Sequence, residues 1–371
     1  MRYLRAILKF FVFASLTAAV AVGAMAIYMN FYGAKHIKSA LSEALGSRVG
    51  FKSVAINMGK AAASFKGFTV AGNMGFEENV FSADTFTVSL NKEKFEKERK
   101  AVFDSVYIKG AKLYIIRNKA GVLNISLPSI KTSALDERLI GPGSVAYAAE
   151  TASRNPFHDV LKVLKNIKIE DSTIAFEDHF GMASPYRIWC DKFYADIVST
   201  EAQGYVATSL NMGCRVPQSR GGDGWARLGG GIALYPDYTN MEVKAETGNV
   251  ELSIFAPYFQ RNTPFYLRSG RFNSRTDFRM HGGNIDSLTT MYITNMSLRI
   301  NPHDPNAQFL QVSINRLGPY LMSGNNIVFD FTMKGSPANP QFGVGPKVKY
   351  AIGMVAMEEV AKAIQTIQRM R

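Results

Sequence analysis

Residues 271–280 read RFNSRTDFRM, and in this stretch every second position is apolar or small. The positions between carry charged or amide side chains. A period of two is typical of a β-strand that turns one face toward a core and the other toward water. The stretch therefore predicts an amphipathic sheet.

The same alternation recurs at residues 85–90 and 327–333, where aromatic or aliphatic side chains fill every second position. Strands are also expected at residues 102–108 and 113–117, with a turn at Lys109-Gly110-Ala111. Residues 126–155 interrupt the pattern with prolines and small side chains, which predicts an inserted loop. The chain from 47 to 346 is therefore expected to be one mainly β domain.

Residues 10–34 contain no charged side chain and follow Arg2, Arg5 and Lys9. A bilayer core of about 30 Å needs roughly 20 apolar residues in a helix. The basic residues before the run favour a cytoplasmic N-terminus. We therefore expect residues 1–33 to form a single transmembrane anchor, with a cleaved signal peptide ending near Ala24-Met25-Ala26 as the alternative.

Helices are expected on either side of the β domain. Residues 34–46 place Ile37 and Leu41 on one face and end at a glycine, which predicts a short amphipathic helix. In residues 347–371 four apolar side chains recur at helical spacing: Met357, Val360, Ile364 and Ile367. This predicts an amphipathic C-terminal helix.

The chain is basic, with a formal net charge of +13 and a pI near 9.6. A basic exported protein meets anionic lipid surfaces or anionic polysaccharide readily, although the charge also serves simple solubility. No run of five like charges occurs, so no nucleic-acid partner is expected.

The chain contains two cysteines, Cys190 and Cys214. If residues 186–200 and 204–216 form a hairpin that turns near Ala202, the two cysteines face each other across the ladder. A disulfide and an unbonded cross-strand contact both fit this placement.

Catalytic and metal-binding patterns are not found. No two of the five histidines stand at i, i+4, and none belongs to a cysteine–histidine cluster, so no metal or other cofactor is expected. Glu177-Asp178-His179 is interpreted as a solvated turn at a strand end. The sequence lacks a Gly-x-Ser-x-Gly elbow, and the chain is not expected to be an enzyme.

Several segments, in their order along the chain, resemble the AsmA-like family of Gram-negative envelope proteins. Val106–Asn124 (VYIKGAKLYIIRNKAGVLN) is similar to a family strand pair ending in a Gly-x-Leu-Asn step, and Ile167–Asp178 (IKIEDSTIAFED) repeats that type. Phe329–Phe342 (FDFTMKGSPANPQF) resembles the terminal strand and its exit. The other matching segments are Ser42–Ile56, Phe65–Val70, Phe81–Leu90, Ala256–Tyr258 and Ser269–Arg271.

The resemblance implies an elongated, curled antiparallel sheet, the β-groove of bridge-like lipid-transfer proteins. It implies a single-pass protein of the cell inner membrane, with the bulk of the chain in the periplasm. The implied function is binding or conduction of phospholipid or another acyl lipid for outer-membrane biogenesis and upkeep. The alternative is a structural or assembly factor that binds envelope proteins through a sheet edge without lipid transport.

The candidate groove-lining residues are the apolar members of the alternating strands. Their alternation would be the same in an ordinary closed core. They are Phe86, Val88, Leu90, Phe272, Phe278, Met280, Ile327, Phe329, Phe331 and Met333.

Overall fold

The computed structural model describes residues 38–39, 41–43, 46–57, 59–72, 75–98, 102–125, 158, 161–162, 164–182, 184–218, 222–258, 265–300, 308–309, 312–323, 326–337 and 339–370. The predicted anchor at 1–33 and the predicted loop at 126–155 lie outside these residues. Within them the chain is mainly β, with 64% strand and a large mixed sheet. In the same part of the chain, no helix has the length and apolar character needed to cross a membrane.

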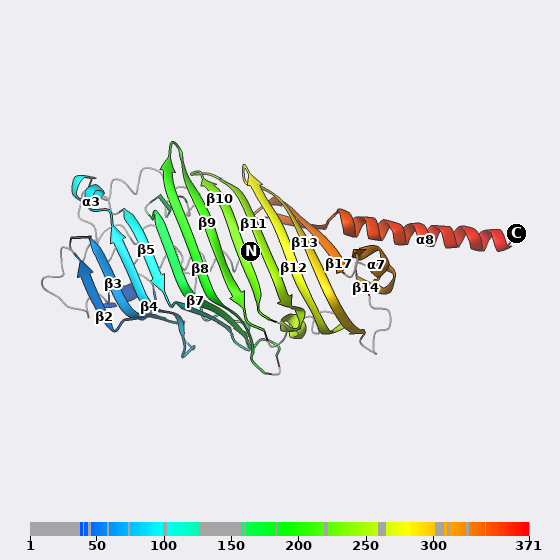
Figure 1. Ribbon diagram of the computed structural model, residues 1–371, viewed down its shortest axis with the longest axis horizontal. Coiled ribbons are helices and arrows are strands. Elements are labelled where there is room, and N and C mark those ends of the chain that lie inside the picture. The colour runs from blue at the N-terminus through cyan, green and yellow to red at the C-terminus, as the bar shows by residue number, and fades with distance from the viewer. Residues whose placement is uncertain are drawn as a thin grey trace. The chain divides into compact units, whose positions relative to one another are not determined.

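The chain divides into two compact units. Unit 1 comprises residues up to Cys214 together with Gly231–Thr239, and unit 2 comprises Arg215–Gly230 and Asn240–Arg371. The elements of unit 1, blue to green in Figure 1, are β1 (Val49–Gly50), β2 (Ser53–Asn57), β3 (Ala62–Ala71), β4 (Asn79–Leu90), α3 (Lys92–Glu98), β5 (Phe103–Lys109), β6 (Lys112–Arg117), β7 (Asn166–Asp178), β8 (Tyr186–Ala202) and β9 (Tyr205–Val216). The unit boundaries pass through β9 and through β10 (Gly224–Leu234).

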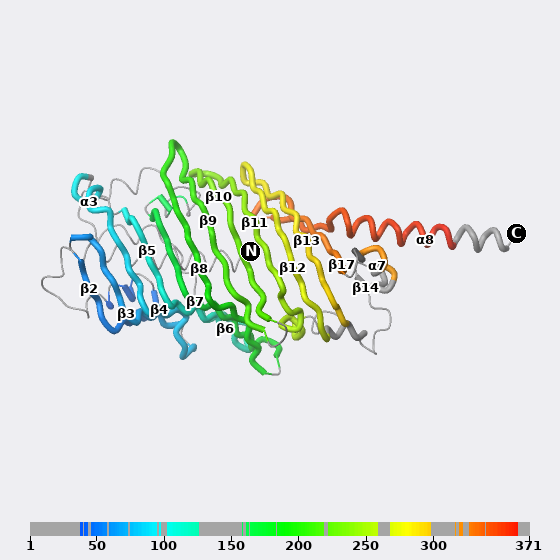
Figure 2. The backbone as a smooth tube through the Cα atoms, in the orientation of Figure 1, coloured from blue at the N-terminus to red at the C-terminus, as the bar shows by residue number. Residues whose placement is uncertain are grey.

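Unit 2 is built around long neighbouring strands, which Figure 2 traces in yellow and orange. Its elements are β11 (Thr239–Glu251), η2 (Leu252–Phe255), β12 (Phe265–His281), β13 (Asn284–Ile300), β14 (Gln308–Phe309), β15 (Val312–Ser313), α7 (Ile314–Leu321), β16 (Met322–Ser323), β17 (Asn326–Ser336), β18 (Asn339–Val344) and α8 (Pro346–Met370). Its strand order is β11-β12-β13-β17-β16, with β18 also paired to β17.

The sheet of unit 1 is not antiparallel throughout. Its order is β1-β3-β4-β5-β7-β8-β9, and both β5 and β6 pair in parallel with β7. A parallel pair needs a connection of a dozen or more residues. The segment between Arg117 and Asn166 supplies that length, so the expectation of a wholly antiparallel sheet is wrong here.

The predicted turn at Lys109-Gly110-Ala111 is also wrong. Val106 pairs with Ile167 and Lys112 with Thr173, so β5 and β6 follow β7 in one register and one direction. Gly110 has a φ of +63°, and a Cβ there would lie 2.2 Å from the Asp84 carboxylate. The glycine therefore marks a local change of backbone direction within one continuing strand, whose register with β4 and β7 is unbroken.

Other strands of this sheet also contain residues with a left-handed backbone at the height of Gly110. Gly67 in β3, Asp171 in β7 and Lys192 in β8 have φ values of 60°, 48° and 48°. At Gly67 the buried positions shift by one, from Ala63 and Phe65 to Phe68 and Val70. The β3–β4 register runs unbroken through Gly67, whereas the β7–β8 register shifts near Asp171 and Lys192, so the strands of unit 1 are irregular at this level.

The core of unit 1 is aromatic. Phe68 stacks on Phe86 with ring centroids 5.0 Å apart, and it meets Phe65 and Phe81 edge-on at 5.9 and 6.3 Å. Leu41, from the segment before β1, is fully buried in the same cluster. The segment ends at Gly46, whose φ of +62° suits a helix stop.

Candidate functional site

The apolar positions of unit 2 share one sheet face. Phe278 in β12 lies opposite Val243 in β11 and Ser287 in β13, and Ser287 lies opposite Met333 in β17. One rung further along, Met280 lies between Met241 and Ile285. At the other end of this face, Ile293 in β13 lies between Phe272 in β12 and Ile327 in β17. Further along β17, Phe329 lies opposite Met291, and Phe331 is on the same face.

Helices α7 and α8 cover one end of this face. Val348, Ala351 and Val355 of α8 are buried against Phe329, Ile293 and Leu321. Phe272, Ile327 and Phe331 pack against the same cluster and remain partly exposed. These candidate lining residues therefore contact protein at this end of the face.

The other end of the face lies outside that cluster. Phe278 and Met333 are half-buried, and Met280 is 7% exposed. Phe342 in β18 lies opposite Met333 and is 76% exposed. Hydroxyls that share the face bond to each other, as in the Thr276–Thr289 pair with 2.9 Å between its oxygens. Because Val243, Ile285 and Ser287 beside them are 7%, 4% and 4% exposed, the open apolar surface at this end is limited to Phe278, Met333 and Phe342.

The candidate residues in unit 1 have a different environment. Phe86, Val88 and Leu90 are 1%, 0% and 5% exposed and belong to the aromatic core. Their side chains contact other protein side chains, as in an ordinary closed core. The candidate ligand-contacting surface therefore lies in unit 2.

On the opposite face of unit 2, side chains of opposite charge lie across from each other on neighbouring strands. Glu242 lies opposite Arg279, which lies opposite Asp286 in the next strand. Asp286 in turn lies opposite Lys334, with 3.9 Å between the charged atoms. Cross-strand pairs of opposite charge stabilise a solvated sheet face. Around Phe278 and Met333, unit 2 therefore has a charged, solvated face opposite the apolar one, whereas Val328 and Asp330 further along the charged face are buried.

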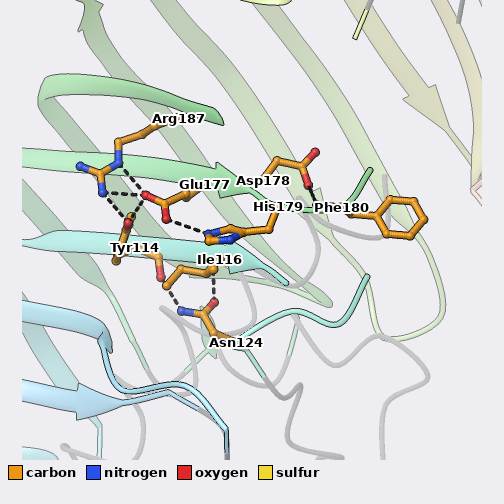
Figure 3. A network of polar contacts seen from close by, with 8 residues as sticks. All are labelled: Tyr114, Ile116, Asn124, Glu177, Asp178, His179, Phe180 and Arg187. Atoms are coloured by element: carbon orange, nitrogen blue, oxygen red, sulfur yellow. Dashed lines mark hydrogen bonds and ion pairs between the residues drawn. The ribbon is translucent and has the colours of Figure 1, made fainter. Parts of the chain in front are cut away.

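A polar network lies at the ends of β6, β7 and β8 in unit 1 (Figure 3). Glu177 accepts hydrogen bonds from the Tyr114 hydroxyl and from Arg187, whose Nη2 lies 2.7 Å from Oε2. His179 Nε2 lies 2.8 Å from the other oxygen of Glu177. The Arg187 guanidinium also stacks on the Tyr114 ring, 5.0 Å from its centroid.

These contacts keep Glu177 ionised. Burial alone would raise the pKa of Glu177, but the hydrogen bonds from Tyr114, Arg187 and His179 outweigh it and hold the pKa at about 2. Burial and the bond to Glu177 raise the pKa of Tyr114. The ionised Glu177 carboxylate in β7 therefore binds side chains of both β6 and β8 and joins the three strands.

The neighbouring Asp178 is fully buried. Arg117 donates to both carboxylate oxygens, with 2.7 Å from Nε to Oδ1, and the Phe180 amide donates to Oδ1 at 3.0 Å. Asn124, also 0% exposed, bonds the backbone of β6 through Ile116 N and Tyr114 O. The interpretation of residues 177–179 as a solvated turn is therefore wrong, because the side chains of Glu177 and Asp178 are bound to adjacent strands and His179 is bound to Glu177.

Acid should weaken the part of the fold that Glu177 stabilises. Its pKa is lowered from 4.5 to about 2 on folding, so this stabilisation is complete above about pH 4.5 and is lost as the pH falls through about 2. Glu177→Gln should lower the free energy of unfolding at neutral pH, and the difference from the unaltered protein should shrink over this window. Urea denaturation at a series of pH values measures it, and a constant difference would contradict the assignment.

Cys190 in β8 and Cys214 in β9 are half-buried on neighbouring strands, and no disulfide joins them. Their side chains are hydrogen-bonded to each other, and this contact, together with burial, raises the pKa of Cys190. The turn of the hairpin lies at Gln203 and Gly204, just beyond the predicted position near Ala202.

The protonated Cys190 thiol should react slowly with iodoacetamide at neutral pH, because the thiolate is the nucleophile. Oxidation with diamide should instead link Cys190 to Cys214 within one chain. Closing a loop of this size stabilises a fold by about 3 kcal/mol in the chain-entropy model. Non-reducing peptide mapping and thermal unfolding check this result, and a link between chains would contradict it.

No group of three or more His, Cys, Asp and Glu side chains that could hold a metal ion occurs among the residues the structure describes.

Sequence alternation missed Phe342 of the apolar face. The signal that could have identified Phe342 is the short segment Asn339–Val344, which follows the clearly alternating β17 and forms a strand of its own. The Arg117–Asp178 pair had no local signal, because its members lie in separate strands.

Comparisons with protein-family models, curated proteins and solved structures found no match to this chain.

Proposed function

We propose that the protein is a single-pass inner-membrane protein that binds or conducts phospholipid, or another acyl lipid, on an apolar sheet face in the periplasm for outer-membrane maintenance. The observation that carries the proposal is the division of unit 2 into an apolar face, partly open around Phe278 and Met333, and a charged opposite face. The compartment and the lipid class come from the resemblance to the AsmA-like family.

The physical basis is the burial of acyl chain. Each buried CH₂ group contributes about 0.8 kcal/mol, so about ten of them on an apolar face contribute roughly 8 kcal/mol. Because the hydroxyls on the face, such as Thr247 and Ser274, bond to each other at 2.8 Å, they present fewer unpaired polar groups to a hydrocarbon chain. The lipid headgroup would remain in water at the sheet edge.

A curled sheet suits this function because it partly encloses a chain along its inner face. Unit 2 carries left-handed residues in adjacent strands, namely Asn249 in β11, Gly270 in β12 and Asn295 in β13. The β11–β12 and β12–β13 registers shift close to these residues. Such irregularities bend strands and support the curled β-groove that the resemblance implies.

One observation also favours the assembly-factor function. The short strand β18 pairs with β17 and carries the strongly exposed Phe342. A sheet margin with an exposed aromatic side chain suits the addition of a partner strand. Pro340 within β18 limits such pairing, because proline donates no backbone hydrogen bond.

Native mass spectrometry of the full chain in detergent tests the lipid proposal. The unaltered protein should carry co-isolated phospholipid, and Phe278→Asp should lose it, because a carboxylate facing acyl chains has a large desolvation cost. Tyr292→Asp is the matched control, since Tyr292 is 42% exposed in β13 and pairs opposite Asn273 and Val328, on the other sheet face.

The control variant should keep its lipid, and both variants should keep the circular dichroism of the unaltered chain. A lipid-free unaltered protein, or equal loss from both variants, would favour the assembly-factor function.

A further inference from the structure

A band of hydroxyl side chains crosses the apolar face of unit 2. Thr247 in β11 lies opposite Ser274 in β12, and Thr276 in β12 lies opposite Thr289 in β13. All four side chains are half-buried. Because Ser274, Thr276 and Phe278 are alternate residues of one strand, their side chains lie on the same face. These four residues, the hydroxyl band, are therefore part of the candidate lipid surface.

The hydroxyl band lies between the two ends of this face. Phe278 and Met333 of the open end are one rung away from Thr276 and its partner. On the other side, Met291 lies opposite Ser274 and packs against the cluster that α8 covers. A hydrocarbon chain on the open end would therefore bring adjoining atoms of the same ligand to the hydroxyl band.

Each hydroxyl pair has one hydrogen atom more than its shared bond uses. The oxygens are 2.9 Å apart in the Thr276–Thr289 pair and 2.8 Å apart in the Thr247–Ser274 pair. A hydroxyl donates only one hydrogen bond, so a pair joined by one bond retains one O–H donor. Neither remaining donor has a protein acceptor among the residues that the structure describes. Since Ser274 and Thr276 are two residues apart in β12, the two donors are separated by about 7 Å.

The two donors determine which ligands the face can accept at low cost. Water can accept from them when the face is open to solvent. A ligand that covers the face removes this water, and a buried hydroxyl without an acceptor is unfavourable. A ligand made of hydrocarbon alone would leave both donors unpaired. A diacyl glycerolipid has ester carbonyls on neighbouring glycerol carbons, and both can accept a hydrogen bond.

We propose that the hydroxyl band recognises the ester carbonyls of a diacyl glycerolipid, with one carbonyl at each hydroxyl pair and the acyl chains over Phe278 and Met333. The inference rests on the proposed function and names the part of the lipid that this face selects. A fatty-acid carboxylate is less suited, because it is charged and the paired positions of this face in β11, β12, β13 and β17 carry no Lys or Arg.

Competition between an ester lipid and an ether lipid tests the inference. The full chain in detergent is mixed with equal amounts of dioleoyl phosphatidylethanolamine and its dioleyl ether analogue, and native mass spectrometry measures the bound lipid. The analogue keeps the headgroup and the hydrocarbon chains and lacks both carbonyls. We expect about fivefold to tenfold more ester lipid than ether lipid on the unaltered protein, which is the size of effect that neutral hydrogen bonds produce.

Removal of the hydroxyls should abolish this preference. Thr276→Val with Thr289→Val removes one pair and keeps the branched side-chain shape, and Thr247→Val with Ser274→Ala removes the other. Each double variant should reduce the preference, and the four substitutions together should bring the ratio to about one. The amount of ether lipid bound should not fall, because the substitutions make the face more apolar.

An equivalent hydroxyl pair in unit 1 provides the matched control. Thr87 in β4 donates to Ser64 in β3 at 2.9 Å, and both side chains are half-buried. They alternate with Phe65 and Phe86 of the aromatic core and lie on the other face of that sheet. Ser64→Ala with Thr87→Val should keep the full preference for the ester lipid.

The possible results separate this inference from the proposed function. Equal binding of the two lipids by the unaltered protein would overturn the recognition of ester carbonyls and leave the lipid proposal in place. Loss of both lipids from the variant with four substitutions would assign the hydroxyl band a structural role and would also overturn the inference. If the unaltered protein bound neither lipid, the proposed function itself would be contradicted, and this inference with it.

Discussion

Arg117→Ala should destabilise the protein by about 3–5 kcal/mol, because the substitution leaves the buried Asp178 carboxylate without its guanidinium partner. The side chain of Asp178 is 0% exposed, and that of Arg117 is 24% exposed. The guanidinium also lies over the rings of Phe176 and Phe180, at 6.0 and 5.1 Å. Urea denaturation followed by tryptophan fluorescence measures the loss.

An exposed ion pair in the same strand provides the control. Lys168 and Glu170 approach to 2.8 Å, but their side chains are 58% and 36% exposed. Exposed pairs contribute about 0–1 kcal/mol, so Lys168→Ala should change stability little. If Arg117→Ala cost no more than Lys168→Ala, Asp178 would have to be hydrated rather than buried.

Phe68→Ala should also cost about 3–5 kcal/mol, through lost apolar burial and the cavity that remains. Phe68 is 1% exposed and contacts the rings of Phe65, Phe81 and Phe86. Thermal or urea denaturation measures this effect.

Phe342→Ala is the matched control for the aromatic core, because Phe342 is 76% exposed. Substitutions of this kind at the surface usually change stability by less than about 0.5 kcal/mol. A small effect at Phe68 would mean that the core of unit 1 opens readily, and the closed packing around Phe86 would then be in question.

The period of two in the sequence predicted the strands because the side chains of a strand alternate between the two faces of a sheet. It was most accurate in unit 2, where residues 271–280 fall within β12 and residues 327–333 within β17. Alternation assigns residues to a face but does not reveal what covers that face. The closed packing of Phe86 and Val88 therefore could not be predicted, nor could the cover that α8 places over Phe329.

Other features depended on long-range pairing. The motif around Gly110 has the composition of a turn, and the continuing strand is recognised only when β7 lies alongside β5 and β6. Asp178 looked solvated because its partner Arg117 lies in another strand, sixty-one residues away. Short sequence motifs carry no signal for such pairs, since the fold brings the residues together.

The central claim is that acyl lipid lies on the apolar face of unit 2, and photocrosslinking from within the sheet tests it most directly. A photoreactive amino acid at Phe278 or Met333 lies on the apolar face, and one at Arg279 or Lys334 lies on the charged face of the same strands. The full chain, irradiated in native membranes and analysed by mass spectrometry, should capture lipid from positions 278 and 333 and not from 279 and 334. Equal capture from both faces, or none from either, would contradict the account.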